Sequence, residues 1–182
     1  FQTGALVALP TDASYVLACH LEDRTAVDRM RQLRGIDEKH LLTLLCRDLS
    51  ELSQYAQVDN RQFRFLKEWT PGAYTFILPA TREVPRRLMH PSRKTVGLRV
   101  PEAPIVQALL AELGVPLLCA SLILPGDEDP LSDPDDIEDR IGKRIDLLVD
   151  GGAGQLEATS VIDVTGDEPV IQRVGLGPVE AM

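Results

Sequence analysis

Short apolar runs separated by turn residues recur along the whole chain. Runs of roughly four to eight apolar residues that are bounded by turn residues are typical of strands buried in a sheet. The sequence therefore predicts strands at residues 5–9, 15–19, 41–46, 73–80, 95–100, 115–124, 146–150, 160–164 and 169–174. Strands are thus expected from one end of the chain to the other.

Three other regions repeat apolar residues every three or four positions, which is the period of an amphipathic helix. Residues 24–34 form the first, and Asp23 before it is a residue type that caps helix starts. Its apolar face consists of Ala26, Val27, Met30 and Leu33. Residues 48–69 predict two helical stretches, and residues 105–113 predict a helix that ends at Gly114.

These elements favour an α/β fold. Because strands outnumber helices and do not alternate strictly with them, we expect a twisted, mixed sheet flanked by helices. A length of 182 residues predicts a single domain over 1–182. The stretch 126–140, with Pro130 and Pro134, is the strongest loop candidate. Since Gly4 already leads into a strand, we expect a leading segment to be missing before Phe1.

The net charge of −9 taken alone argues against a nucleic-acid partner, but the charge is unevenly spread. Eight of the 28 acidic residues lie in 126–140, so the rest of the chain is close to neutral. Basic residues gather in two groups, Arg24, Arg29, Arg31, Arg34 and Lys39, and Arg82, Arg86, Arg87, Arg93, Lys94 and Arg99. A local basic face binds phosphates despite an acidic total. Solvated helix surfaces are the alternative interpretation.

Cysteine and histidine usage argues against disulfides and metals. Cys19, Cys46 and Cys119 each lie in an apolar run without a C-x-x-C spacing, which predicts buried, reduced thiols and a cytoplasmic location. The three histidines lack the spacing of metal ligands, so no tightly bound metal is expected. No apolar run reaches the ~20 residues of a membrane span, and no membrane partner is expected.

Two polar stretches at strand ends leave their role open. Pro10-Thr11-Asp12-Ala13-Ser14 separates the first two predicted strands. It forms either the wall of a pocket or a turn whose side chains bond the backbone. The stretch 150–154, Asp-Gly-Gly-Ala-Gly, either cradles a phosphate with its backbone N–H groups or is a plain turn.

Several motifs in a fixed order resemble the YrdC/YciO family, and the version seen here is most similar to its YciO branch. They are PTDASY (10–15), RQLRGIDEKHLLTLLC (31–46), PGAYTFIL (71–78), VGLRVPEAP (96–104), CASLILPG (119–126), DLLVDGG with TSVIDV (146–164) and VIQRVG (170–175). The resemblance covers nearly the whole chain. It implies a YrdC-like twisted open sheet flanked by helices.

The resemblance also implies a reaction and partners. The best-known family members are L-threonylcarbamoyladenylate synthases, which use ATP, L-threonine and bicarbonate to prepare the modification of adenosine 37 of tRNA. Family members are also associated with double-stranded RNA binding. ATP with Mg²⁺ is therefore the expected cofactor, and tRNA or double-stranded RNA is the expected partner.

Matching the motifs residue by residue gives the expected site. The substrate- or nucleotide-binding residues would be Thr11, Tyr15, Arg31, His40, Arg99, Ser121, Thr159, Ser160 and Arg173. Arginines among them suit phosphates and carboxylates, which a planar guanidinium binds through two hydrogen bonds. The RNA-binding residues would be Arg31, Arg34, Lys39, Arg86, Arg87, Arg93 and Lys94. No catalytic residue is assigned.

The chain departs from the family motifs at several polar positions. Leu33 replaces the second cation of K-x-R, with Arg34 adjacent, and Ile123 replaces the asparagine of S-A-N. Ala103 and Ala13 replace a histidine and a threonine. Loss of a transition-state contact typically costs ~10²–10³ in rate. We therefore expect a protein that binds RNA and nucleotide in a basic cleft, within threonylcarbamoyladenosine metabolism. An active synthase is the alternative.

Overall fold

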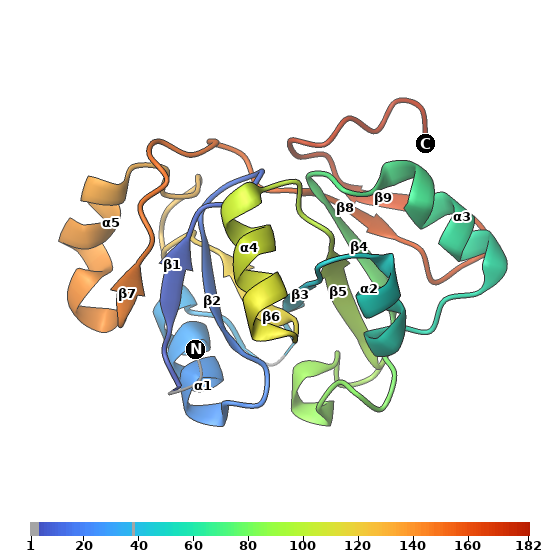
Figure 1. Cartoon of the computed structure of the whole chain (residues 1–182), viewed down its shortest axis with the longest axis horizontal. Helices are drawn as coiled ribbons and strands as arrows, with labels where there is room; N and C mark the ends of the chain where they lie inside the picture. Colours follow the sequence, from blue (N-terminus) through green and yellow to red (C-terminus); the bar gives the residue numbers. More distant parts are fainter. Residues whose placement is uncertain (1–3, 38) are drawn as a thin grey trace.

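The computed structural model describes residues 4–37 and 39–182 (Figure 1). Its strands are β1 (Val7–Leu9), β2 (Val16–His20), β3 (Thr43–Leu45), β4 (Tyr74–Pro79), β5 (Thr95–Arg99), β6 (Leu117–Ser121), β7 (Leu147–Leu148), β8 (Ser160–Asp163) and β9 (Val170–Arg173). Its helices are α1 (Arg24–Arg34), α2 (Leu49–Tyr55), α3 (Asn60–Trp69), α4 (Pro104–Leu113) and α5 (Pro134–Ile141), with single 3₁₀ turns η1 (Arg86–Leu88) and η2 (Gly142–Arg144). No helix in the described residues is long and apolar enough to cross a membrane.

All nine strands form one open, mixed sheet in the order β7-β1-β2-β6-β3-β5-β4-β8-β9. The pairs β1/β7, β3/β5 and β4/β8 are parallel, and the other neighbours are antiparallel. Figure 1 shows α5 and β7 at one end of the sheet and β8 and β9 at the other. The expected α/β fold with a mixed sheet flanked by helices is confirmed.

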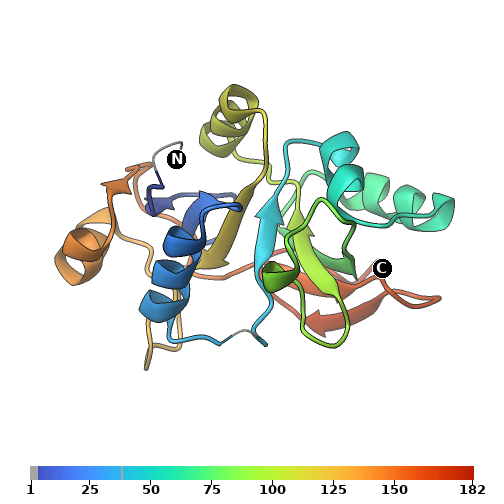
Figure 2. The same ribbon diagram turned by 90° about the horizontal axis from the view of Figure 1, so that it is seen from below.

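Side chains alternate between the two faces of this sheet, because successive residues of a strand point in opposite directions. One face carries the large core, in which helices α1, α2 and α3 bury Met30, Leu52 and Leu66 against residues such as Leu44 and Phe76. The other face is covered only in part. There α4 packs on β1, β2 and β6, and Figure 2 shows α1 and α4 on opposite sides of these strands.

The helix ends follow the expected local chemistry. The Asp23 side chain accepts a hydrogen bond from the Ala26 N–H at 2.9 Å, which satisfies an otherwise unpaired donor at the start of α1. Gly35 and Gly114 end α1 and α4 with φ of 67° and 71°. This left-handed conformation favours glycine, which has no Cβ to clash. The predicted strands are present, and several are shorter than their apolar runs.

The loop expected at 126–140 is wrong in its second half, where α5 begins. The Asp133 side chain accepts from the Asp135 N–H at 2.9 Å, and Pro134 occupies the first helical turn, where its missing N–H costs nothing. Ile137 and Ile141 are buried four residues apart on the same face. Two prolines and many acids concealed a short helix whose acidic first turn suits the helix dipole.

Candidate functional site: a cationic cleft on the uncovered half of the sheet

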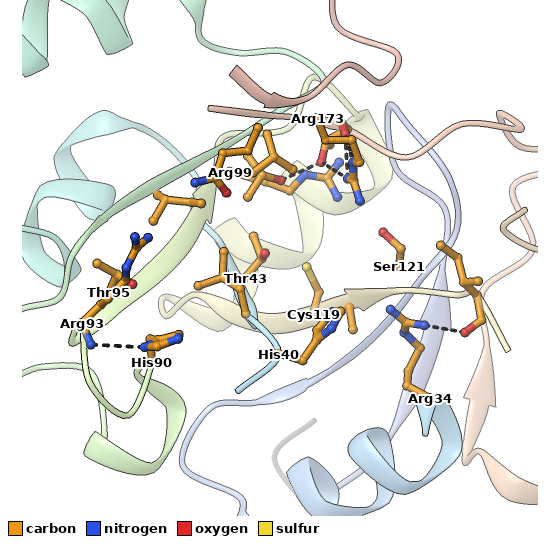
Figure 3. Close-up of a pocket in the computed structure, with 18 residues that line it drawn as sticks. Arg34, His40, Thr43, His90, Arg93, Thr95, Arg99, Cys119, Ser121 and Arg173 are labelled. Atoms are coloured by element: carbon orange, nitrogen blue, oxygen red, sulfur yellow. Dashed lines mark hydrogen bonds between the residues drawn. The ribbon is translucent and has the colours of Figure 1, made fainter. Parts of the chain in front are cut away.

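A cleft of about 330 Å³ lies on the sheet face that α4 leaves open. Strands β3, β4, β5, β6, β8 and β9 and the segments around His40 and His90 supply its walls (Figure 3). The residues that line it are Arg34, His40, Leu41, Thr43, Thr75, Ile77, His90, Arg93, Thr95, Arg99, Cys119, Ala120, Ser121, Ile123, Thr159, Val161, Gln172 and Arg173. Such a volume is at the lower end of the range for small-molecule sites.

Hydroxyl side chains form the floor of the cleft. Thr43, Thr75 and Thr95 come from three neighbouring strands at positions that alternate with buried core residues. Gly97 lies between them, and a Cβ at this position would stand 2.7 Å from Thr43 Oγ1 and 3.1 Å from Thr75 Cγ2. A glycine here therefore leaves room above the floor that any other residue would occupy.

The described residues that line the cleft carry charge of a single sign. Four arginines and two histidines are among them, and none of them is acidic. Burial and then the charge of Arg173 lower the pKa of Arg34, and burial and then the charge of Arg99 lower the pKa of Arg173. These arginines repel one another in a chain whose net charge is −9. A bound anion would relieve that repulsion.

Arg99 is held by the polar stretch that separates β1 from β2. Its Nη2 donates to Asp12 Oδ1 at 2.9 Å and to Thr11 Oγ1 at 3.2 Å. The other carboxylate oxygen of Asp12 accepts from the Glu102 N–H at 2.8 Å. Arg99 is 3 % exposed, and its Nε has no hydrogen-bond partner among the described residues. The stretch thus orients a buried guanidinium at the cleft.

Arg173 and the threonine pair form the opposite wall. Arg173 donates from Nε and Nη2 to the Thr159 carbonyl at 3.0 and 2.6 Å. The hydroxyls of Thr75 and Thr159 lie 2.7 Å apart and are both buried. Because a carbonyl neutralises no charge, Arg173 keeps its full positive charge for a ligand.

Arg34 and His40 lie at a third side of the cleft. Arg34 donates from Nη1 to the Ile123 carbonyl, and its buried Nε has no partner in the part of the chain that the structure describes. His40 is exposed at the mouth. Partial desolvation and then the Arg34 charge lower its pKa. The negative charge of a bound phosphate would oppose the effect of Arg34 and raise the pKa of His40.

The structure brings six of the nine residues expected to bind substrate or nucleotide to this cleft, counting Thr11, which touches it through Arg99. Arg99, Thr159, Arg173, His40 and Ser121 line it directly. The other three, Arg31, Tyr15 and Ser160, do not line it.

Arg31 is engaged elsewhere in the fold. It donates to the Arg87 carbonyl at 3.1 Å, and Arg87 donates to the Leu21 carbonyl at 3.2 Å. The two arginines thus attach η1 to α1 and to the end of β2. Arg34, one helical turn further along α1, reaches the cleft instead. Arg34 is therefore the α1 cation that a ligand in the cleft would meet.

Tyr15 and the loop at 150–154 stabilise each other. The fully buried Tyr15 hydroxyl donates to the Gly152 carbonyl at 2.6 Å and accepts from the Gly151 N–H at 3.1 Å. The Gly152 N–H donates to Asp150, and the Gly154 N–H donates to the Ser132 carbonyl. Since the three glycine N–H groups already have acceptors, this loop is a turn that docks on Tyr15.

Ser160, the first residue of β8, faces away from the cleft, because it directly follows Thr159 and successive residues of an extended chain point to opposite faces. Its hydroxyl donates to the Gly177 carbonyl at 2.6 Å and accepts from the Gly175 N–H at 2.8 Å. It therefore fixes the segment that follows β9.

The residues expected to bind RNA divide into three groups. Arg34 and Arg93 line the cleft, and Arg31 and Arg87 attach η1 to its neighbours. Lys39, Arg86 and Lys94 are exposed. Only the last group and Arg93 offer charges to a large partner.

Some cleft residues were missed from the sequence. Thr43, Thr75 and Thr95 have a signal that was available, because each is a polar residue that alternates with apolar ones within a predicted strand. His90 and Gln172 have no such signal, since only the tertiary fold brings them here. Within the described residues no cluster of three or more His, Cys, Asp or Glu side chains is arranged to hold a metal ion.

Comparison with known proteins shows the family and the fold. Residues 1–175 match the family model for Sua5, YciO and YrdC proteins, which is described as "Telomere recombination". The chain is 51% identical to the uncharacterized protein YciO of Escherichia coli K12, over 97% of this chain and 86% of the relative. The crystal structure of E. coli YciO superposes with a TM-score of 0.95 over 98% of this chain and 87% of that chain.

Two more distant relatives carry functional names. The threonylcarbamoyl-AMP synthase of Vibrio vulnificus YJ016 is 27% identical over 93% of this chain and 92% of the relative. The crystal structure of P. abyssi Sua5 complexed with L-threonine is 27% identical, with a TM-score of 0.86 over 96% of this chain and 51% of that chain.

Proposed function

Because this chain belongs to the Sua5/YciO/YrdC family, we propose that its cleft binds an adenine nucleotide through the phosphate, within threonylcarbamoyladenosine metabolism of tRNA. One observation carries the proposal. The cleft gathers Arg34, Arg93, Arg99 and Arg173, and none of the described residues that line it carries a carboxylate, although the chain as a whole is strongly acidic. Such a site favours an anion.

The contacts of the arginines support a phosphate in particular. Arg34 and Arg99 each keep a buried Nε without a partner among the described residues, and an unsatisfied buried donor costs about 1–3 kcal/mol. A phosphate oxygen would satisfy such donors through charge-assisted hydrogen bonds. Hydroxyls of Thr43, Thr95 and Ser121 would bond further oxygens.

The same residues define what the chain contributes when ATP with Mg²⁺ is the ligand. The arginines would bind and orient the phosphates, and the sheet floor would exclude water below them. Because no carboxylate lies among the described residues that line the cleft, Mg²⁺ would be held chiefly by phosphate oxygens and water, as is usual for this ion. The metal supplies charge neutralisation for phosphoryl chemistry.

A working L-threonylcarbamoyladenylate synthase, using L-threonine and bicarbonate, is the second candidate. The synthase relative from Vibrio vulnificus spans nearly the whole chain, and Sua5 of the same fold binds L-threonine. Ile123 weighs against it, because an apolar side chain lines the cleft where the family motif has an asparagine. We therefore favour nucleotide binding over synthesis of threonylcarbamoyl adenylate as the function of the cleft.

Calorimetry with AMP and ATP tests nucleotide binding. We expect micromolar binding by the unaltered protein and a loss of at least about tenfold in Arg34→Gln, since a charged hydrogen bond contributes about 1.5–3 kcal/mol. Arg24→Gln is the matched control, because Arg24 is an exposed arginine of the same helix. Equal affinities in both variants, or no binding at all, would refute the proposal.

Mass spectrometry then separates the two candidates. The protein is incubated with ATP, Mg²⁺, L-threonine and bicarbonate. Threonylcarbamoyl adenylate that depends on Arg34 would establish the synthase. Bound nucleotide without product would leave the cleft as a binding site with different or weak chemistry.

We also propose that tRNA or double-stranded RNA contacts the exposed cations Lys39, Arg86, Arg93 and Lys94. Such contact recognises the shape of the RNA backbone. Its affinity must fall as the salt concentration rises, because the release of bound counterions then gains less free energy. The charge-reversed variant Arg86→Glu/Lys94→Glu should weaken tRNA binding without changing AMP affinity, in a gel-shift assay at two salt concentrations. An unchanged affinity, or one insensitive to salt, would rule this contact out.

A further inference from the structure

The turn that follows η1 determines which ring nitrogen of His90, at the cleft, carries the hydrogen. His90 Nδ1 accepts from the Arg93 N–H at 3.1 Å and from the Ser92 N–H at 3.3 Å. Two backbone hydrogen bonds close the same turn. The Lys94 N–H donates to the His90 carbonyl at 3.0 Å, and the His90 N–H donates to the Thr95 carbonyl at 2.9 Å. An imidazole nitrogen that accepts N–H donors cannot itself carry a hydrogen. The ring hydrogen of His90 therefore lies on Nε2.

That donor is available to a ligand. His90 lines the cleft, and no group among the described residues accepts a hydrogen bond from its Nε2 (Figure 3). Thr95 lies beside it on the floor, and its hydroxyl likewise has no bonded partner within 4–37 and 39–182. Together they form an uncharged hydrogen-bonding corner of the cleft.

This corner differs from the rest of the cleft in charge. Arg93 is the arginine nearest along the chain, and it is paired with Asp163 at 3.8 Å. Asp163 also accepts from the Gln172 side chain at 3.3 Å. Arg34 and Arg173, in contrast, bond carbonyls and the Thr159 hydroxyl and pair with no carboxylate among the described residues. One part of the cleft is thus built for an anion, and the His90 corner for a neutral group with acceptor atoms.

We propose that His90 is a specificity-determining residue of the cleft, whose Nε2–H donates to an acceptor nitrogen of the nucleobase in the bound nucleotide. This inference rests on the proposed nucleotide binding. It adds that the corner formed by His90 and Thr95 recognises the nucleobase end of the nucleotide. A nucleotide has the matching polarity, with an anionic phosphate at one end and ring-nitrogen acceptors at the other.

Two variants of His90 distinguish the roles of the two ring nitrogens. Glutamine at position 90 extends an amide N–H to about the position of Nε2. Asparagine instead offers an acceptor near Nδ1 and no donor at Nε2. We expect His90→Asn to weaken AMP binding about five- to tenfold, as for one lost hydrogen bond, and His90→Gln to stay within about twofold. Ribose 5-phosphate, which lacks the base, should bind equally to the unaltered protein and both variants.

The outcomes of this calorimetric experiment distinguish the two proposals. Equal AMP affinity in His90→Asn and the unaltered protein would overturn the role of His90. A loss of both ligands in His90→Gln alone would also overturn it, since His90 would then act only by shaping the turn that carries Arg93. Failure of the unaltered protein to bind either ligand would overturn nucleotide binding and the inference together. Thermal unfolding of each variant confirms that the fold is retained.

Discussion

The two halves of one sheet face have opposite characters. Over β1 and β2, α4 covers the face, and the residues beneath it are apolar, such as Val16, Ala18 and Leu117. Over β4 and β5 no helix in the described part of the chain covers it, and Thr75, Thr95 and Arg99 occupy the equivalent positions. Cys119 lies at the boundary and contacts both halves. The position of a single helix therefore decides where the sheet is a core and where it is a binding surface.

The largest expected effect comes from Arg99→Met, which removes the cation at the edge of the uncovered half. Arg99 and Asp12 form an ion pair whose side chains are 4% and 11% exposed. Breaking a buried pair from one side costs about 3–5 kcal/mol of unfolding free energy, because the remaining charge stays buried. Urea denaturation measures this loss.

A double variant sharpens the interpretation. Asp12→Asn combined with Arg99→Met removes both charges, so we expect it to recover part of the stability lost by Arg99→Met alone. Affinity for AMP should remain low in the double variant, since the cleft still lacks its guanidinium. Losses that simply add would indicate that the pair contributes no coupling.

The substitution Leu110→Ala tests the covered half by removing a buried side chain from its core. Leu110 of α4 is fully buried, and deletion of such a leucine typically costs about 2–5 kcal/mol. We expect this loss in urea denaturation and an unchanged AMP affinity in the protein that remains folded. Ile105→Ala on the exposed side of the same helix should change stability by less than about 0.5 kcal/mol. A large loss of affinity in Leu110→Ala would show that the halves are not independent.

A smaller effect is expected from Thr75→Val on the uncovered half. The variant keeps the shape of the side chain but leaves the buried Thr159 hydroxyl without its 2.7 Å partner. Such a loss costs about 1–3 kcal/mol. We expect AMP affinity to fall as well, because Thr159 helps to position Arg173. Thr25→Val, at an exposed site of α1, is the control for the substitution itself.

The smallest effect concerns His40 and pH. Its pKa is lowered in the folded protein, so the unfolded chain binds the proton more readily. Stability should therefore fall as pH drops below about 6.5, the ordinary pKa of histidine, and His40→Gln should reduce this dependence. A bound phosphate should raise the pKa of His40, which NMR titration with and without AMP detects. An unchanged titration would place the phosphate away from His40.

Local patterns were the most reliable part of the sequence. The caps Asp23 and Gly114 and the strands β4 and β5 follow from neighbouring residues alone, and the structure confirms them. The helix at 134–141 was missed because prolines and acids in a row resemble a loop until the buried pair Ile137 and Ile141 is recognised.

The chemical character of the candidate site could be predicted from the sequence, but the residues that form it could be predicted only in part. Arg99, Arg173 and Ser121 were found from motifs at strand ends, whereas Arg31 was favoured over Arg34 on the same helix. One helical turn separates the last two, and both have the same residue type. Only the placement of η1 against α1 shows which of them is already bonded.

The sequence by itself therefore determined the strands, the helix ends, the mixed sheet and the supply of arginines and hydroxyls, because these depend on residue type and short-range spacing. The tertiary structure decided which polar residues share the cleft and which merely hold the fold together. Tyr15, Ser160 and Arg31 belong to the second group. Their roles depend on partners 15 to 137 positions away in the chain, and no local pattern carries that information.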